Sequence, residues 1–121
     1  MATRELEGVR HHLFICNGGS CLKRGGEEVT QSIRDQIARL AADDLIHTTR
    51  TRCNGRCTDA CVVIHYPEGT WYRDMTEETG RELVRRLVHE KSADDADHAT
   101  YTYQDGQFFS SRQCKRGAIL G

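Results

Sequence analysis

The sequence predicts an α/β fold in which a mixed sheet is flanked by helices. Short runs of apolar and β-branched residues, typical of strands, occur at residues 12–15, 45–52 and 62–66. A helical spacing of apolar residues separates the first two runs, and a tight-turn sequence joins the third to a short strand starting at residue 71. Strands joined through a helix are parallel and strands joined by a tight turn are antiparallel, so the sheet is predicted to be mixed.

The first half of the chain predicts a strand, a loop, a helix and a second strand. The strand at residues 12–15 ends at Cys16, and residues 17–26 hold four glycines, which predicts a loop. A helix is predicted next, because apolar residues fall at the spacing of one helical face: Val29, Ile33, Ile37 and Leu40. The second strand, at residues 45–52, is followed directly by Cys53.

The second half predicts a hairpin and another helix. Residues 62–66 form a strand of the buried type, and the Tyr-Pro-Glu-Gly sequence at residues 66–69 predicts a tight turn into the returning strand at 71–73. Thr76 is a suitable N-cap for a helix that reaches residue 90, with an apolar stripe at Leu83, Val84, Leu87 and Val88.

The composition changes after Lys91. Residues 92–98 are acidic and poor in apolar side chains, as in a linker. Residues 100–109 predict a small hairpin around an Asp-Gly turn. We therefore expect one domain at residues 1–91, followed by a linker and C-terminal extension at residues 92–121.

Composition and charge exclude several classes of protein. The 121 residues contain 17 Lys and Arg against 18 Asp and Glu, so binding to nucleic acid through bulk basicity is not expected. No apolar run approaches the ~18 residues that a membrane span needs, so no membrane partner is expected. Residues 1–10 lack the apolar core of a secretory signal, which predicts a cytoplasmic and reducing location.

The six cysteines are the most informative feature of the sequence. Four of them form two pairs, a C-x4-C pair at residues 16 and 21 and a C-x3-C pair at residues 53 and 57. Each pair follows a predicted strand and lies in a segment that contains glycine. If the two strands are parallel neighbours, both pairs emerge at the same edge of the sheet. Four thiolates in one small volume, in a reducing location, predict a metal centre rather than disulfides.

Two cofactors suit four cysteines, a 2Fe–2S cluster and a structural zinc ion. The cluster takes four cysteine ligands, and glycine N–H groups can approach its sulfurs closely. Structural zinc also takes four cysteines, usually from C-x2-C pairs. The wider pairs of this chain favour the larger, two-iron group. A redox dithiol would need C-x-x-C, which does not occur.

Several residues around the cysteines match a known family. They are Phe14-Ile15-Cys16, Gly18, Cys21, Arg24-Gly25, Cys53-Asn54-Gly55-Arg56-Cys57 and the run from Val62 to Tyr72. Through them, residues 9–90 resemble the thioredoxin-like 2Fe–2S ferredoxins and the cluster domain of the E subunit of bacterial NADH dehydrogenases. The resemblance implies a thioredoxin-like fold, transfer of single electrons, and one 2Fe–2S cluster per chain with four ligands, Cys16, Cys21, Cys53 and Cys57. Members of the family often form dimers, so a homodimer is one expectation.

Two further cysteines depart from the family pattern. Cys61 stands where the family usually has proline, and we expect it to be a buried thiol, with a spare ligand as the alternative. Cys114 lies outside the resemblance and is expected to be a free thiol. His65, Trp71 and Tyr72 are expected to pack within the sheet rather than to bind metal or relay electrons.

The sequence therefore predicts a small ferredoxin, an electron carrier rather than an enzyme, which meets redox partner proteins that the sequence does not name. The alternatives are a zinc-binding interaction module and a cluster-bearing accessory subunit of a larger oxidoreductase. Only fifteen residues precede Cys16, which favours a stand-alone ferredoxin. Basic residues flank both cysteine loops, and we expect them to offset the cluster's charge and to face an acidic partner: Lys23, Arg24, Arg50, Arg52 and Arg56.

Overall fold

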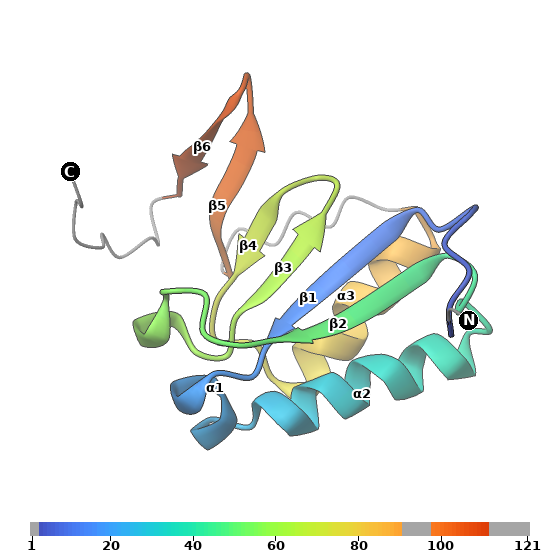
Figure 1. Cartoon of the computed structure of the whole chain (residues 1–121), viewed down its shortest axis with the longest axis horizontal. Helices are drawn as coiled ribbons and strands as arrows, with labels where there is room; N and C mark the ends of the chain where they lie inside the picture. Colours follow the sequence, from blue (N-terminus) through green and yellow to red (C-terminus); the bar gives the residue numbers. More distant parts are fainter. Residues whose placement is uncertain (1–2, 91–97, 112–121) are drawn as a thin grey trace.

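The computed structural model describes residues 3–90 and 98–111. Its six strands form one sheet in the order β2-β1-β3-β4-β5-β6 (Figure 1). The strands are β1 (His11–Cys16), β2 (Ile46–Thr51), β3 (Val63–Tyr66), β4 (Thr70–Tyr72), β5 (Ala99–Gln104) and β6 (Gln107–Ser110). β1 and β2 are parallel, and every other neighbouring pair is antiparallel. The predicted α/β class with a mixed sheet is confirmed.

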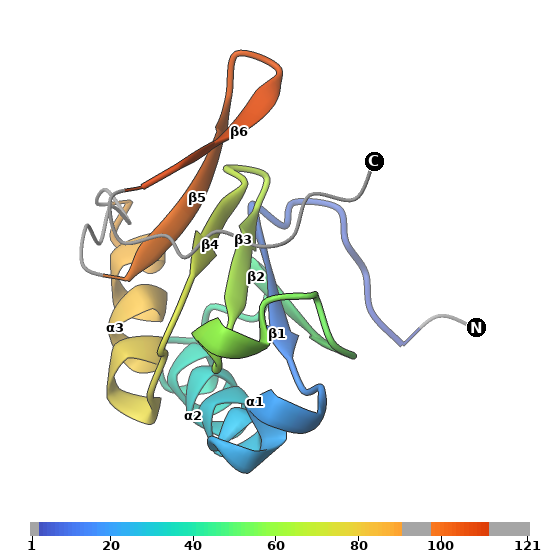
Figure 2. The ribbon, with the colours of Figure 1, turned by 90° about the vertical axis from the view of Figure 1, so that its left-hand side faces the viewer.

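Helices α2 (Gly26–Arg39) and α3 (Glu77–Val88) lie against the same face of the sheet (Figures 1 and 2). The core between sheet and helices contains fully buried side chains such as Leu13, Ile33 and Val84. Gly80 lets the two helices approach, because a Cβ there would lie 2.9 Å from Cγ1 of Ile33. This close approach explains why a residue with poor helix propensity is present in α3.

Local signals in the sequence account for several element boundaries. Thr76 caps α3 by accepting a hydrogen bond from the Thr79 N–H, in a capping box with the Thr79 side chain. Asp105 and Gly106 both have positive φ, as a two-residue hairpin turn requires, and the predicted hairpin is confirmed as β5 and β6. The predicted turn after β3 is also confirmed, and its Tyr66–Pro67 peptide bond is cis.

The structure corrects one expectation near the first cysteine pair. Residues 17–26 were expected to form a loop throughout, yet the short helix α1 (Gly19–Lys23) lies within them. Its single turn closes through Leu22 N–H to Gly18 C=O at 2.8 Å. Gly25, which separates α1 from α2, has a positive φ. Among the described residues, no helix combines the length and apolar character that crossing a membrane requires.

Candidate metal centre

The two cysteine pairs lie side by side because β1 and β2 end together. Cys16 is the last residue of β1, and its register partner is Thr51, the last residue of β2. Cys21 follows in α1, while Cys53 comes two residues after β2. Cys57 begins the 3-10 turn η1 (Cys57–Asp59). Parallel strands therefore deliver both pairs to the same end of the sheet.

All four thiols line one small cleft. The sulfurs of Cys53 and Cys57 are 3.5 Å apart, and the Cys16 thiol donates to the carbonyl of Arg52 at 3.5 Å, across the two loops. Within residues 3–90 and 98–111, no three His, Cys, Asp or Glu side chains are close enough to hold a single metal ion.

Glycines allow this close approach of the two loops. A Cβ added at Gly18 would lie 2.7 Å from Cα and 2.8 Å from N of Cys53, so any larger residue would separate the loops. A Cβ at Gly26 would lie 2.9 Å from the carbonyl oxygens of both Cys16 and Cys21. Gly18 and Gly26 are therefore required by packing between the cysteine segments, and not by an unusual φ.

Hydrogen-bond donors point at the sulfurs from both loops. Burial opposes ionisation of Cys16, but hydrogen bonds from the Gly18 N–H, from Cys21 and from Asn54 outweigh it and lower the pKa of this thiol. Gly55 N–H also points at the Cys53 sulfur, at 3.3 Å. Burial raises the pKa of the adjacent Cys21 thiol to about 12. Four thiols with N–H donors around them are a donor set that fits an anionic iron–sulfur group.

The remaining described cysteine is not part of the cleft. Cys61 is 1% exposed, and its thiol donates to the carbonyls of Arg24 at 3.2 Å and Cys21 at 3.5 Å. Burial raises the pKa of this thiol. Cys61 is the buried thiol that the sequence predicts. Cys114 lies outside the described residues.

The five basic residues near the loops fall into two groups. Arg50 pairs with Glu27 at 2.7 Å, and Arg56 pairs with the buried Asp59 at 2.7 Å. The other three are exposed and form no ion pair within the described part of the chain: Lys23, Arg24 and Arg52. The charge available to a partner is therefore concentrated on these three.

Sequence reasoning did not single out Asn54 and Asp59. Asn54 bridges the loop internally, donating to Thr51 Oγ1 at 2.7 Å, and also bonds to the sulfur of Cys16. Asp59 accepts a hydrogen bond from the Arg56 side chain across the 3-10 turn. No sequence pattern predicts this turn. The Asn-Gly pair between Cys53 and Cys57 could have indicated that Asn54 shapes the loop. No sequence pattern indicates the role of Asp59.

The expectations for the histidine and the aromatics near the sheet can also be checked. His65 is buried, and its Nε2 lies 2.9 Å from Nδ1 of His11, so it is a hydrogen-bonded sheet residue. Burial lowers the pKa of His65 to about 4. Tyr72 is in the core, whereas Trp71 is only partly buried and projects from the other face of the sheet.

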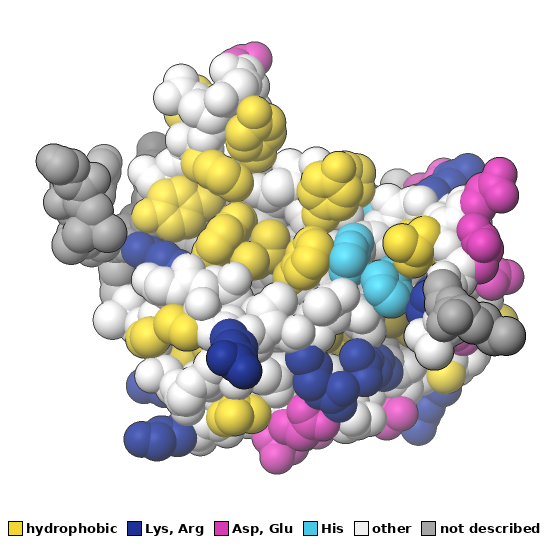
Figure 3. Space-filling view, in the orientation of Figure 1, with side chains coloured by type: hydrophobic (Ala, Val, Ile, Leu, Met, Phe, Trp, Pro, Cys, Tyr) yellow, Lys and Arg dark blue, Asp and Glu magenta, His cyan; other side chains and the backbone are white. Residues whose placement is uncertain are grey.

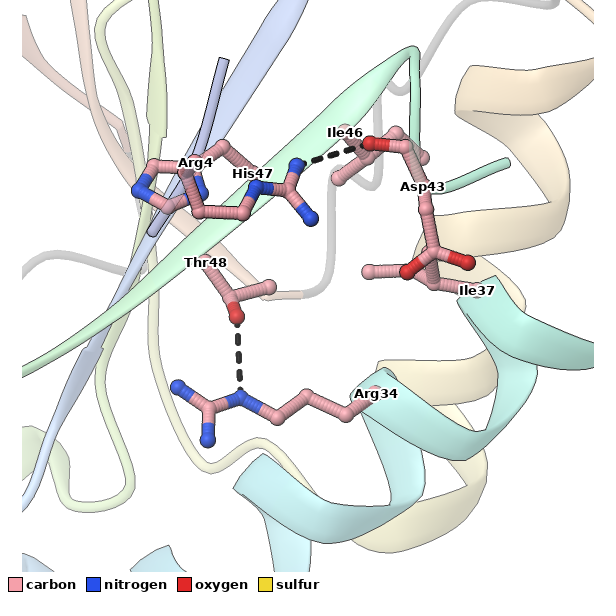
Figure 4. A pocket seen from close by; sticks show the side chains of 7 residues that line it. All are labelled: Arg4, Arg34, Ile37, Asp43, Ile46, His47 and Thr48. Atoms are coloured by element: carbon pink, nitrogen blue, oxygen red, sulfur yellow. Dashed lines mark hydrogen bonds between the residues drawn. The ribbon is translucent and has the colours of Figure 1, made fainter. Parts of the chain in front are cut away.

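A second hollow, of about 250 Å³, lies between the first residues of β2 and helix α2, at the other end of β2 from the cysteine cleft (Figure 4). It contains no thiol, and both of its guanidinium groups are engaged: Arg4 donates to the Asp43 carbonyl at 2.7 Å, and Arg34 donates to Thr48 Oγ1 at 2.9 Å. The remaining lining residues are Ile37, Ile46 and His47. Of these two hollows, the cysteine cleft is the one whose lining includes thiols.

Comparison with known proteins shows which family the chain belongs to. A model of the thioredoxin-like [2Fe-2S] ferredoxins matches residues 3–88. The chain belongs to this family. The family match contains all four cleft cysteines and confirms the predicted family, fold and cofactor class, a 2Fe–2S cluster rather than zinc.

Individual relatives agree with the family match. The chain is 52% identical over 84 residues to a Priestia megaterium protein provisionally named as a 2Fe-2S ferredoxin, an alignment that spans 69% of this chain and 65% of that relative. A 2Fe-2S ferredoxin of Aquifex aeolicus is 33% identical over 86 residues, covering 62% of this chain and 76% of the relative. A solved structure of a thioredoxin-like [2Fe-2S] ferredoxin from Aquifex aeolicus superposes with a TM-score of 0.72 at 25% identity, covering 84% of this chain and 99% of that one.

Proposed function

We propose that the chain carries single electrons between redox proteins, with one 2Fe–2S cluster held by Cys16, Cys21, Cys53 and Cys57. The observation that supports this most directly is the meeting of two cysteine pairs in one cleft within a ferredoxin family domain. When bound, such a cluster takes up and releases one electron without changing any covalent bond of the protein.

The chain's own residues prepare the cleft for a negatively charged group. The N–H groups of Gly18 and Gly55 and the side chain of Asn54 point at thiol sulfurs. Such donors stabilise added negative charge and so favour the reduced form. Cys16 and Cys21 anchor the site in the body of the domain, while Cys53 and Cys57 are exposed and face the solvent from which a partner approaches.

We extend the proposal to the organisation of the chain. Residues 1–91 are the ferredoxin domain, and residues 92–121 are an extension whose hairpin, β5 and β6, lengthens the sheet beyond β4. The chain acts in the cytoplasm and is a carrier rather than an enzyme. An accessory subunit of a larger oxidoreductase is the second candidate, because it would use the same cleft and differ only in its partner.

Anaerobic purification tests the proposal. The protein should be brown, contain about two irons and two acid-labile sulfides per chain, and give an EPR signal after reduction with dithionite. Cys61→Ala, which removes a thiol outside the cleft, should keep this cluster. A colourless protein with one zinc per chain, or equal loss of iron in Cys61→Ala and in variants of the cleft cysteines, would contradict the proposal.

A further inference from the structure

One face of the sheet carries a continuous band of apolar side chains that no described helix covers. Register partners project on the same side of a sheet, and Phe14 pairs with Ile64, Ile64 with Trp71, and Trp71 with Tyr101. Both described long helices lie on the opposite side (Figure 2). Together with three neighbours, these side chains form what we call the aromatic face: Phe14, Ile64, Tyr66, Trp71, Tyr101, Tyr103 and Phe108. Figure 3 shows this band of hydrophobic side chains across the sheet.

The aromatic face is exposed and at the same time internally ordered. Tyr66, Tyr103 and Phe108 are 59%, 48% and 52% exposed. Three rings of the aromatic face nevertheless contact edge to face: the centroid of the Phe108 ring lies 5.2 Å from that of Tyr103 and 6.3 Å from that of Trp71. A contiguous apolar patch of this kind marks an interaction site on a protein surface, whereas isolated exposed apolar residues do not.

The aromatic face begins where the second cysteine loop ends. A hollow of about 190 Å³ is lined by Asn54 and Arg56 of that loop on one side and by Trp71, Tyr101 and Phe108 on the other. Asn54 and Arg56 also line the cysteine cleft. The Arg56 guanidinium lies 5.2 Å above the centre of the Tyr101 ring, which joins the two surfaces. A protein seated on the aromatic face would therefore lie against the exposed cysteine pair.

The charge beside this surface indicates the kind of protein that fits it. Lys23, Arg24 and Arg52 are exposed around the cysteine loops. Lys and Arg side chains lie along the margin of the hydrophobic band in Figure 3. A surface that offers carboxylates would pair with them, whereas a second copy packed over the cysteine end would bring the same three cations together.

We propose that the aromatic face is the docking surface for an acidic redox protein. The partner's apolar patch covers Trp71, Tyr103 and Phe108, and its carboxylates meet the cations around the cysteines. This inference rests on the proposed function, because it gives the electron carrier of the previous section its partner class. One electron passes from the reduced ferredoxin to the oxidised partner, and no bond is formed or broken.

Stopped-flow reduction of two probe proteins tests the proposal. The holoprotein is reduced with dithionite, freed of reductant, and mixed with the soluble domain of cytochrome b5, which is acidic, or with cytochrome c, which is basic. One electron from each ferredoxin converts one ferric haem to ferrous haem. We expect fast reduction of the acidic cytochrome that slows as salt is added, because opposite charges steer the encounter. A rate that rises with salt would overturn the proposal.

Two adjacent phenylalanines provide a matched pair of variants. Phe108 is paired with Tyr103 and lies on the aromatic face, whereas Phe109 is paired with Thr102 and is 41% exposed on the other side of the same hairpin. Phe108→Ala should slow reduction of the acidic cytochrome about tenfold, as loss of an aromatic anchor does, and Phe109→Ala should leave it unchanged. Tyr103→Ala is the second variant on the aromatic face and should act like Phe108→Ala. Equal rates in the Phe108 and Phe109 variants would overturn the proposal.

Cluster content and molecular mass distinguish a failure of the proposed function from a failure of the proposed docking surface. Iron, sulfide and the visible spectrum are measured first on every variant, so absence of a cluster in the wild type contradicts the proposed function and not the docking surface alone. Sedimentation of the wild type as a dimer, with Phe108→Ala as a monomer, would mean that a second copy covers the aromatic face and would overturn the proposal. Arg52→Glu should slow reduction of the acidic cytochrome and weaken its salt dependence, with the cluster intact, because Lys23 and Arg24 remain.

Discussion

The two cysteine pairs of this ferredoxin sit in contrasting surroundings. Cys16 and Cys21 are each 3% exposed and belong to a strand end and a helix that are packed against the core. Cys53 and Cys57 are exposed on a surface loop. The first pair is thus a fixed half of the site and the second an adaptable half, and the position of the second relative to the first depends on the contacts between the loops.

Replacement of one cysteine ligand in each half should have the largest effect on cluster content. Cys16→Ser should lose almost all cluster iron, because β1 is paired on both sides and its backbone cannot move to bring the shorter side chain to the metal. Cys57→Ser should keep part of its iron, since the exposed loop can shift. Iron and sulfide per chain and the visible spectrum are the measurements. Equal loss in both variants would remove the distinction between a fixed and an adaptable half.

Loss of the Arg56–Asp59 ion pair in the second loop should have the next largest effect, on the free energy of unfolding. Arg56 and Asp59 are 12% and 2% exposed, so Arg56→Gln leaves a carboxylate buried without its partner and should cost about 3 kcal/mol of unfolding free energy. Arg50→Gln is the control, because the Arg50–Glu27 pair is largely exposed and screened by solvent. Urea denaturation followed by circular dichroism compares the two variants. Similar midpoints would mean that the second loop does not depend on this pair.

Separation of the two loops should have a smaller effect on stability. Gly18→Ala places a methyl group against the backbone of Cys53 and should cost about 1–2 kcal/mol, through overpacking, and lower the iron content. Gly19→Ala is the matched control, since nothing lies within 4 Å of a Cβ at that position. Denaturation midpoints and iron content are measured on both. A stable, fully loaded Gly18→Ala protein would show that the loops can separate without cost.

The smallest expected effect concerns a single hydrogen bond between the halves. Asn54→Ala removes a donor to the Cys16 sulfur, so the reduced form loses stabilisation and the reduction potential should fall. Thr58→Ala, an exposed change in the same loop, is the control. A redox titration followed by EPR measures the potentials. A potential unchanged from wild type would mean that Asn54 only shapes the loop.

Much of the fold follows from local patterns, and the missing parts are those that depend on distant contacts. The apolar spacing of α2 and α3 and the turn after β3 predict these elements to within a few residues. The Asp-Gly turn predicts the final hairpin, but its attachment to β4 involves the pairing of Trp71 with Tyr101, which no local pattern encodes. Helix α1 escapes prediction because the glycines around it, which the close packing of the loops requires, lower its helix propensity.

The candidate site divides in the same way. Cys16, Cys21, Cys53 and Cys57 can be found from their spacing after two strands, because parallel neighbours end together. Asp59 cannot be found in this way, since its role arises only when the turn after Cys57 folds back and brings Arg56 onto Tyr101. The aromatic residues of the open sheet face are similarly ambiguous in sequence, because alternation alone does not show which side of the sheet the helices cover.

The alignment of Cys16 with Thr51 restricts how the length of this chain can vary. A residue inserted within β1 or β2 would send the following side chains to opposite sides of the sheet and carry one cysteine pair away from the other. Insertions at the far end of α2, in the turn that leads into β2, leave the strand ends together. Across homologous chains, the number of residues between the second and third cysteines should therefore drift, while the short step from each strand to its cysteine should stay constant.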